Sequence, residues 1–196
     1  MKYKTVLLFG APGSGKGTQG AIIGRIPGFV HVACGEIFRS LRVGSPLGHV
    51  FISYSSRGEL VPDDISIQLW RDYIDGLVKT ERFDPSSDTL VLDGIPRNVA
   101  QANLMRDYIE VNRVFYLDCH NREIMFTRLK RRALRENRLD DASDAVIANR
   151  LQVYEAETAP VLEYYPKDII RSIDSSRTPV EVLVDILVDI KAALAE

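Results

Sequence analysis

The feature that most constrains this chain is a glycine-rich segment that directly follows a short apolar run. Residues 5–9 read TVLLF and lead into GAPGSGKGT at 10–18. The apolar run predicts a buried strand, and the glycines let the backbone turn so that successive N–H groups point inward. The helix expected next adds the positive end of its dipole, and Lys16 adds a mobile cation. Strand, turn, lysine and helix in this order predict a phosphate-binding site.

The rest of the chain continues this alternation of short apolar runs with longer amphipathic segments. The pattern is typical of an α/β fold in which helices cover a parallel sheet. Strands are expected at residues 5–9, 29–32, 89–92, 114–117 and 168–173. Helices are expected at residues 15–25, 65–80, 99–110, 122–135, 143–158 and 179–195. Two stretches, 35–62 and 131–141, are too rich in glycine or charge to look like core, and we expect them to stand off the sheet.

Charge and cysteine content exclude several classes of protein. The chain has 25 Lys and Arg against 27 Asp and Glu, a net charge of −2, so no overall basic field attracts nucleic acid. Two cysteines are too few for a disulfide framework or a four-cysteine zinc site. No apolar run approaches the ~20 residues that span a bilayer. The apolar stretch from Val6 to Phe9 is too short for the core of a signal peptide, so we expect a cytoplasmic protein. We also expect no nucleic-acid or membrane partner.

A second apolar run ends in a carboxylate. Residues 89–92 precede Asp93, as in the strand that positions the metal in other phosphate-loop proteins. The residue after Lys16 is Gly17, where a hydroxyl residue usually holds Mg²⁺, and Thr18 comes one position later. Phosphates and water would then hold the metal, with Asp93 acting through a bound water. The alternative is that Asp93 only caps the next turn.

Several segments of the chain resemble the adenylate kinases, in the order of that family. Besides the phosphate loop, they are HVACGEIFR at 31–39, GELVPD at 58–63, DGIPRNVAQ at 93–101, RLKRR at 128–132, RLDD at 138–141 and RL at 150–151. The resemblance implies a P-loop kinase domain over 1–196 with a five-stranded parallel sheet. It also implies an inserted monophosphate-binding lobe at 33–62 and a short lid at 131–142. The implied reaction is ATP + AMP ⇌ 2 ADP with Mg²⁺, carried out by a monomer.

The same resemblance assigns roles to individual residues. The residues implied to bind ATP are Gly13, Ser14, Gly15, Lys16, Gly17, Thr18, Arg128 and Arg132. Those implied to bind AMP are Cys34, Arg39, Glu59, Leu60, Val61, Gly94, Ile95, Pro96, Arg97, Gln101, Arg138 and Arg150. Those implied to act in catalysis are Lys16, Asp93, Arg97, Arg132, Arg138 and Arg150. Arginine suits phosphoryl transfer because its planar fork grips phosphate oxygens and stays charged. No general base is needed, because the acceptor is already an anion.

Some positions depart from the family pattern. Cys34 replaces the usual threonine, and Glu36 replaces the usual aspartate. Glu36 and Asn98 both resemble the related UMP/CMP kinases. Gln101 occupies the adenine-reading position, and its amide can donate to adenine N1 while it accepts from N6. We therefore predict AMP as the acceptor. The alternatives are a UMP/CMP kinase and a nucleotide-binding switch or adaptor with little or no activity.

The predicted lid is short, because only residues 133–137 separate Arg132 from Arg138. It lacks the four cysteines of longer family lids, so we predict no structural zinc. Arg131 and Arg135 have no family role and are expected to face solvent. Two neighbouring carboxylates, Asp140 and Asp141, are expected to pair with the arginines or to cap the helix near residue 143. The turn at 177–179 resembles the one whose backbone contacts the ATP adenine.

Overall fold

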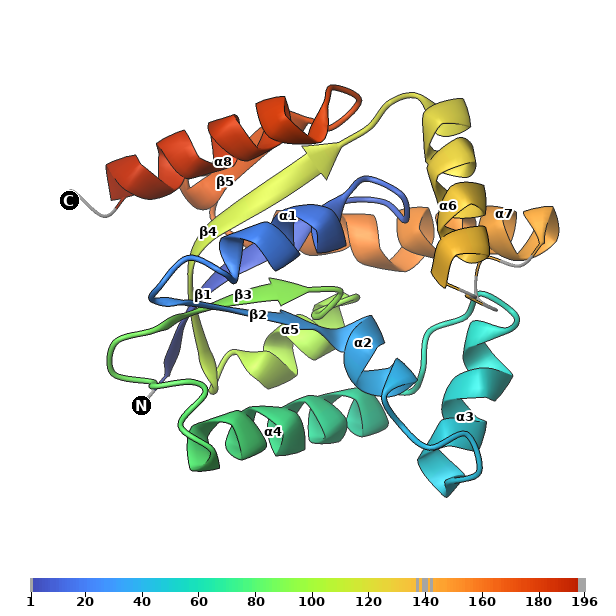
Figure 1. The fold of residues 1–196 in the computed structure, drawn as a ribbon, viewed down its shortest axis with the longest axis horizontal. Coiled ribbons are helices and arrows are strands. Elements are labelled where there is room, and N and C mark those ends of the chain that lie inside the picture. The colour runs from blue at the N-terminus through green and yellow to red at the C-terminus, as the bar shows by residue number, and fades with distance from the viewer. Residues whose placement is uncertain (1, 137, 139–140, 142, 194–196) are drawn as a thin grey trace.

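Helices cover both faces of a five-stranded sheet in the computed structural model, which describes residues 2–136, 138, 141 and 143–193 (Figure 1). The strands are β1 (Tyr3–Phe9), β2 (Phe29–Ala33), β3 (Thr89–Asp93), β4 (Ile109–Asp118) and β5 (Ile170–Asp174). The helices are α1 (Lys16–Ile23), α2 (Cys34–Arg39), α3 (Pro46–Ser55), α4 (Asp63–Lys79), α5 (Val99–Met105), α6 (Arg122–Glu136), α7 (Asp144–Val153) and α8 (Pro179–Ala193). None of the helices described here is long and apolar enough to cross a membrane.

All strand pairs are parallel, in the order β2-β3-β1-β4-β5, which confirms the predicted α/β class and five-stranded parallel sheet. The central strand β1 pairs with β3 on one side and with β4 on the other. The chain leaves β1 towards one edge of the sheet and leaves β3 towards the other. The carboxyl end of β1 therefore lies at a switch in strand order, where open parallel sheets bind their ligands.

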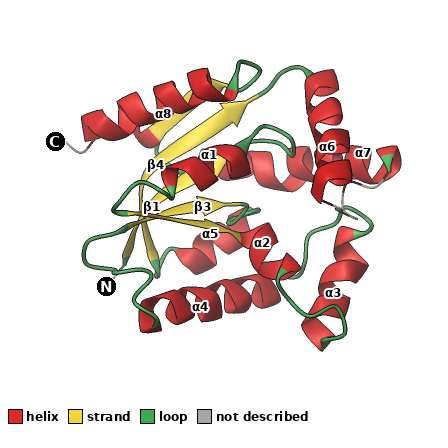
Figure 2. Cartoon of the chain, viewed as in Figure 1, coloured by secondary structure: helices red, strands yellow, loops and turns green. Residues whose placement is uncertain are grey.

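Alternate side chains of β1 supply the two layers of the core. Leu7 and Phe9 face one apolar cluster, whereas Val6 and Leu8 face another, as the period of two in a strand requires. The first cluster is completed from α4 and α5 by Trp70, Ile74, Leu77, Ala102 and Met105. The second is completed from α1 and α8 by Ile23, Val182, Ile186 and Ile190. Figure 2 shows the strands between these two helical layers, and this rigid centre holds the loops at its carboxyl edge.

The helix predicted at 99–110 extends too far at its C-terminal end. The helix stops at Met105, and β4 begins at Ile109, well before the strand start predicted at 114. Residues 109–112 read IEVN, in which apolar and polar side chains alternate with the period of a strand. This alternation, rather than a continuous apolar run, marks the part of β4 that lies nearer the surface.

The helix predicted at 143–158 is α-helical only from Asp144 to Val153. Ser143 caps its start, because its Oγ accepts the N–H of Val146 at 3.2 Å. Two shorter segments follow, a π-helical turn (Tyr154–Thr158) and a 3-10 helix (Ala159–Tyr164). Pro160 has no N–H for an α-helical bond, and its ring would clash with the carbonyl four residues earlier. β5 likewise begins at Ile170 rather than 168, because a 3-10 turn (Lys167–Ile169) precedes it.

The two stretches predicted to stand off the sheet are only partly separate from the core. Residues 35–62 contain most of α2 and all of α3, and Figure 1 shows α3 lying away from the sheet. However, Ile37, Phe38 and Val61 are buried in the main apolar cluster, so the expectation of no core is wrong there. Residues 131–136 of the predicted lid continue α6, while residues 137, 139–140 and 142 lie outside the described part of the chain.

Candidate active site

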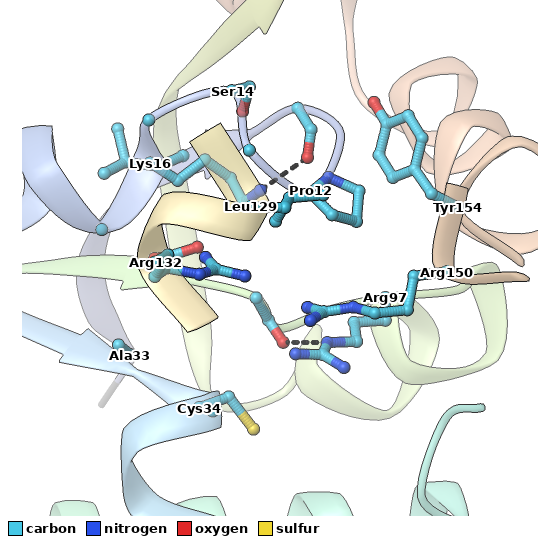
Figure 3. Close-up of a pocket in the computed structure, with 18 of the residues that line it drawn as sticks. Pro12, Ser14, Lys16, Ala33, Cys34, Arg97, Leu129, Arg132, Arg150 and Tyr154 are labelled. Atoms are coloured by element: carbon cyan, nitrogen blue, oxygen red, sulfur yellow. Dashed lines mark hydrogen bonds between the residues drawn. The ribbon is translucent and has the colours of Figure 1, made fainter. Parts of the chain in front are cut away.

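A cleft of about 790 Å³ opens at the carboxyl edge of the sheet. Its walls come from the glycine-rich loop after β1, the end of β3, α2, α6 and α7 (Figure 3). Every residue predicted for the site lines this cleft except Ile95, which is 2% exposed and packs in the main apolar cluster. Residues that lie far apart in the sequence therefore meet in one space.

The glycine-rich loop depends on backbone conformations and close contacts that other residues would not allow. Gly13 has φ +86°, and a Cβ there would lie 2.9 Å from the carbonyl oxygen of Met125 in α6. Gly15 has φ +100° and forms the N-terminal cap of α1 without a side-chain bond. A side chain at either position would strain the loop. The loop therefore presents bare N–H groups at the positive end of a helix, which is an arrangement that binds phosphate.

Lys16 is held against the carbonyls of the loop that carries it. Its Nζ donates to the carbonyl oxygens of Gly10 at 2.6 Å and Ala11 at 3.1 Å. Burial lowers the pKa of Lys16 to about 8, while Asp93 raises this pKa and nearby arginines lower it further. Those arginines are Arg132, Arg97 and Arg150. Mutual repulsion among these cations favours an anion between them.

Two arginines lie at the α2 and α5 side of the cleft. Arg97 donates from Nε to the carbonyl oxygen of Gly94 at 2.9 Å. Arg39, at the end of α2, folds over Gly35, where a Cβ would lie 3.1 Å from its Nη1. Figure 3 shows Arg97 on the opposite side of the cleft from Lys16, with Cys34 nearby. Guanidinium groups suit phosphate oxygens, so this side of the cleft has the chemistry of a second phosphate site.

A buried carboxylate joins two further arginines at the lid side. Asp141 has a side chain that is 0% exposed and pairs with both Arg132 and Arg150. Arg132 donates from Nε to Asp141 Oδ2 at 2.8 Å, and Arg150 Nη1 bonds to Oδ1. The second carboxylate predicted for this role, Asp140, lies outside the described residues. Arg138 instead pairs with Glu136 at the rim.

The turn before α8 and the middle of α6 enclose another part of the cleft. Arg128 donates from Nη1 to the carbonyl oxygen of Ser175 at 2.9 Å, which ties α6 to the turn at 175–179. Gln19 in α1 donates from Nε2 to the carbonyl oxygen of Pro179 at 2.9 Å. The sequence did not predict this role of Gln19, because its position in α1 indicates only that it lies on a helix. These bonds place the turn expected near the ATP adenine beside the phosphate loop.

Two arginines near the end of α6 differ from the prediction. Arg131 and Arg135 are exposed, as predicted, but they also line the cleft rather than facing solvent alone. They lie three and seven residues after Arg128, on one helix face. Helical spacing was the signal that could have found them.

Asp93 places a carboxylate beside the start of α1. It ends β3 beside α1, where a Cβ on Gly17 would lie 3.5 Å from its Oδ2. Within the described ranges, no group of three or more His, Cys, Asp or Glu side chains could hold a metal by itself. One carboxylate beside a phosphate loop fits Mg²⁺, which keeps several waters and takes phosphate oxygens as ligands. The absence of structural zinc stays a prediction.

Cys34 begins α2 and lines the cleft as a buried thiol. Burial raises its pKa to about 11, so it stays protonated at neutral pH. The predicted segment Glu59, Leu60 and Val61 lines the same part of the cleft, together with Gln101. The second cysteine, Cys119, is buried in a separate apolar cluster, as predicted for a small apolar filler.

Comparison with known proteins agrees with this geometry. A family model described as adenylate kinase matches residues 8–170. The adenylate kinase of Thermosynechococcus vestitus is 36% identical over 189 residues, covering 90% of this chain and 92% of its own. That of Mycobacterium tuberculosis strain H37Rv is 36% identical over 183 residues, covering 90% and 93%. That of Phocaeicola vulgatus is 33% identical over 169 residues, covering 83% and 85%. These matches give no support to a UMP/CMP kinase or a switch, and the chain belongs to the adenylate kinase family of nucleoside monophosphate kinases.

Proposed function

We propose that this protein transfers the terminal phosphoryl group of ATP, bound with Mg²⁺, reversibly to AMP and forms two ADP. The observation that carries the proposal is the convergence of Lys16, Arg97, Arg132 and Arg150 on one space between the phosphate loop and α2. Phosphoryl transfer needs fixed positive charge around the equatorial oxygens of the moving group. A cleft with cations on several sides supplies that charge from preorganised groups.

The donor nucleotide binds at the phosphate loop. Its N–H groups and the N-terminus of α1 bind the phosphates of ATP, and Lys16 exchanges its bonds to Gly10 and Ala11 for phosphate oxygens. The arriving negative charge favours the protonated form of Lys16 and so raises its lowered pKa. Arg128 and the turn at 175–179 form the side of the site that receives the donor base.

The acceptor AMP binds on the opposite side, with its phosphate between Arg39 and Arg97. No general base is required, because the attacking oxygen already carries negative charge. Arg132, Arg138 and Arg150 stabilise the charge that spreads over the transferring group. Asp141 holds Arg132 and Arg150 in place beforehand, so little reorganisation is needed when the substrates bind.

The Mg²⁺ that accompanies ATP supplies positive charge to the oxygens of the transferring phosphates. Asp93 is the residue of this chain that would hold it, acting through a bound water. The position of Asp93 beside Gly17 supports this role. We further propose that the protein is a cytoplasmic monomer acting on small molecules, and its net charge of −2 supports the absence of a nucleic-acid partner.

A coupled assay with AMP, UMP and CMP as acceptors tests the proposal. We expect kcat/KM to be highest with AMP, because the amide of Gln101 complements the adenine edge. Higher kcat/KM with UMP or CMP would contradict the choice of acceptor. Turnover with none of the three would contradict the proposed activity altogether.

A further inference from the structure

The side-chain amide of Gln101 is held by two different partners inside the cleft wall. Its Oε1 accepts the backbone N–H of Arg97 at 2.7 Å. Its Nε2 donates to Oδ1 of Asp63 at 2.8 Å, across 38 positions of sequence. Gln101 lines the cleft and is only 1% exposed, whereas Arg97 and Asp63 are half-buried. A hydrogen bond with one fully buried partner is partly protected from exchange with solvent.

These two contacts allow only one orientation of the amide. A backbone N–H can face only the amide oxygen, and a carboxylate can face only the amide nitrogen. Turning the amide over would set donor against donor at Arg97 and acceptor against acceptor at Asp63. Each contact leaves one hydrogen-bonding position of the Gln101 amide unused. The Oε1 atom can still accept one more hydrogen bond, and the Nε2 atom can still donate one more.

The remaining donor and acceptor distinguish adenine from hypoxanthine. Adenine has an acceptor at N1 and a donor at N6, which complement an amide N–H and an amide oxygen. Hypoxanthine has the opposite pattern, with a donor at N1 and an acceptor at O6. An amide fixed in one orientation therefore binds one base and repels the other, whereas an amide that can turn over accepts both.

We propose that Asp63 is a positioning residue that fixes the Gln101 amide and so sets the preference for adenine over hypoxanthine in the acceptor. This inference rests on the proposed function, because it assumes that the acceptor base lies against Gln101. Asp63 acts through Gln101 and need not touch the substrate. Asp63 lies in α4, whereas Gln101 lies in α5.

The surroundings of Asp63 support this role. It is the first residue of α4, two positions after Val61 at the end of the segment that lines the acceptor side. Asn98 donates from Nδ2 to both of its oxygens, at 3.0 and 3.2 Å. The Oδ1 atom of Asn98 caps α5 by accepting the N–H of Gln101 at 2.8 Å. One carboxylate thus anchors the side chains of both Asn98 and Gln101.

A matched pair of variants tests the proposal. Asp63→Ala removes the anchor, while Asp64→Ala removes the same charge from the same first turn of α4 at an exposed position. The dissociation constants of AMP and IMP are measured by titration calorimetry, and KM and kcat are measured with saturating ATP. We expect D63A to lower the preference for AMP over IMP about tenfold through weaker AMP binding, with the KM for ATP unchanged. D64A should match the wild type.

A double-mutant cycle separates positioning from a merely structural effect. If Asp63 acts through Gln101, then D63A added to Gln101→Ala should not change the AMP-to-IMP ratio further. Equal losses in both backgrounds would overturn the proposal. If D63A does not fold, Asp63→Leu keeps a side chain of similar size but has no acceptor for the Gln101 amide, and it should lower the same ratio.

The wild-type arm separates this inference from the proposed function. A wild type that prefers AMP, with a D63A or D63L variant that keeps the full AMP-to-IMP ratio, would overturn the role of Asp63 alone. A wild type that prefers a pyrimidine acceptor would overturn the proposed acceptor, and the role of Asp63 with it.

Discussion

At the scale of single residues, the site is defined by charges that burial makes costly. Lys16 is enclosed among three arginines, and burial lowers its pKa to about 8 from an ordinary value of 10.5. Asp93 offsets only part of this effect. Placing these cations together destabilises the empty site, but the same cations stabilise bound phosphate.

The lowered pKa predicts a pH dependence of ATP binding. Above about pH 8 the free protein loses the Lys16 proton, so the affinity for ATP should fall by up to about tenfold per pH unit. The free energy of unfolding should rise with pH between about pH 8 and about pH 10.5. In that range the unfolded chain still holds the Lys16 proton, whereas the folded protein has lost it. Titration calorimetry from about pH 7 to about pH 9.5 measures the affinity. An affinity that stays constant over this range would contradict the role of Lys16.

Removing the Lys16 cation should impair catalysis itself. Lys16→Ala should lower kcat by several orders of magnitude, because fixed charge around the transferring group provides most of the rate enhancement. The exposed Lys130→Ala, which removes a surface pair with Asp144, is the matched control and should keep kcat. Full activity of the Lys16 variant in the coupled assay would mean that the phosphates bind elsewhere.

A second residue-scale prediction concerns the thiol in the acceptor site. Cys34→Thr replaces a weak hydrogen-bonding group with a hydroxyl and should lower the KM for AMP about threefold. The KM for ATP should not change. Cys119→Ala is the control, since that thiol lies in a separate apolar cluster. An unchanged KM for AMP would show that Cys34 does not contact the acceptor.

At the scale of elements, the sequence predicts best where one local rule decides the structure. The apolar run at 5–9 and the glycines after it locate β1 and its loop, since burial and backbone freedom act within a few residues. The strand predicted at 114–117 is shorter than β4, because the first half of β4 alternates polar and apolar side chains. The Asp63–Gln101 bond joins two helices 38 positions apart, and no local pattern shows such a contact. The pairing of Asp141 was expected, yet its complete burial follows only from the packing of α6 and α7.

The lid arginines give an element-scale prediction. Asp141→Asn leaves Arg132 and Arg150 without their shared charge, so it should lower kcat by ~10-fold to ~100-fold. It should also reduce the free energy of unfolding by ~1–3 kcal/mol, because both arginines are partly exposed and water screens part of the loss. Asp144→Asn is the control, since its pair with Lys130 lies at the surface and contributes little. Chemical denaturation and the coupled assay measure both effects. Equal behaviour of the two variants would contradict the role of Asp141.

At the scale of the whole molecule, a rigid sheet holds one phosphate site while helical segments outside it bring the other charges. α1 and α8 cover one face, α4 and α5 cover the other, and α3, α6 and α7 lie beyond the carboxyl edge (Figure 1). Gly58, where a Cβ would lie 2.8 Å from Arg150 Cγ, brings the segment after α3 against α7. We expect the acceptor lobe and lid to close over both nucleotides on the microsecond to millisecond scale and to exclude water.

The most direct test is the structure of the protein bound to a molecule with two adenosines joined by five phosphates. We predict a single bound molecule whose phosphate chain runs from the glycine loop and Lys16 to Arg39 and Arg97. One adenine should lie near Arg128 and the other near Gln101. A chain that does not reach Arg39 and Arg97, or two molecules bound independently, would contradict the claim that the two phosphate sites face each other.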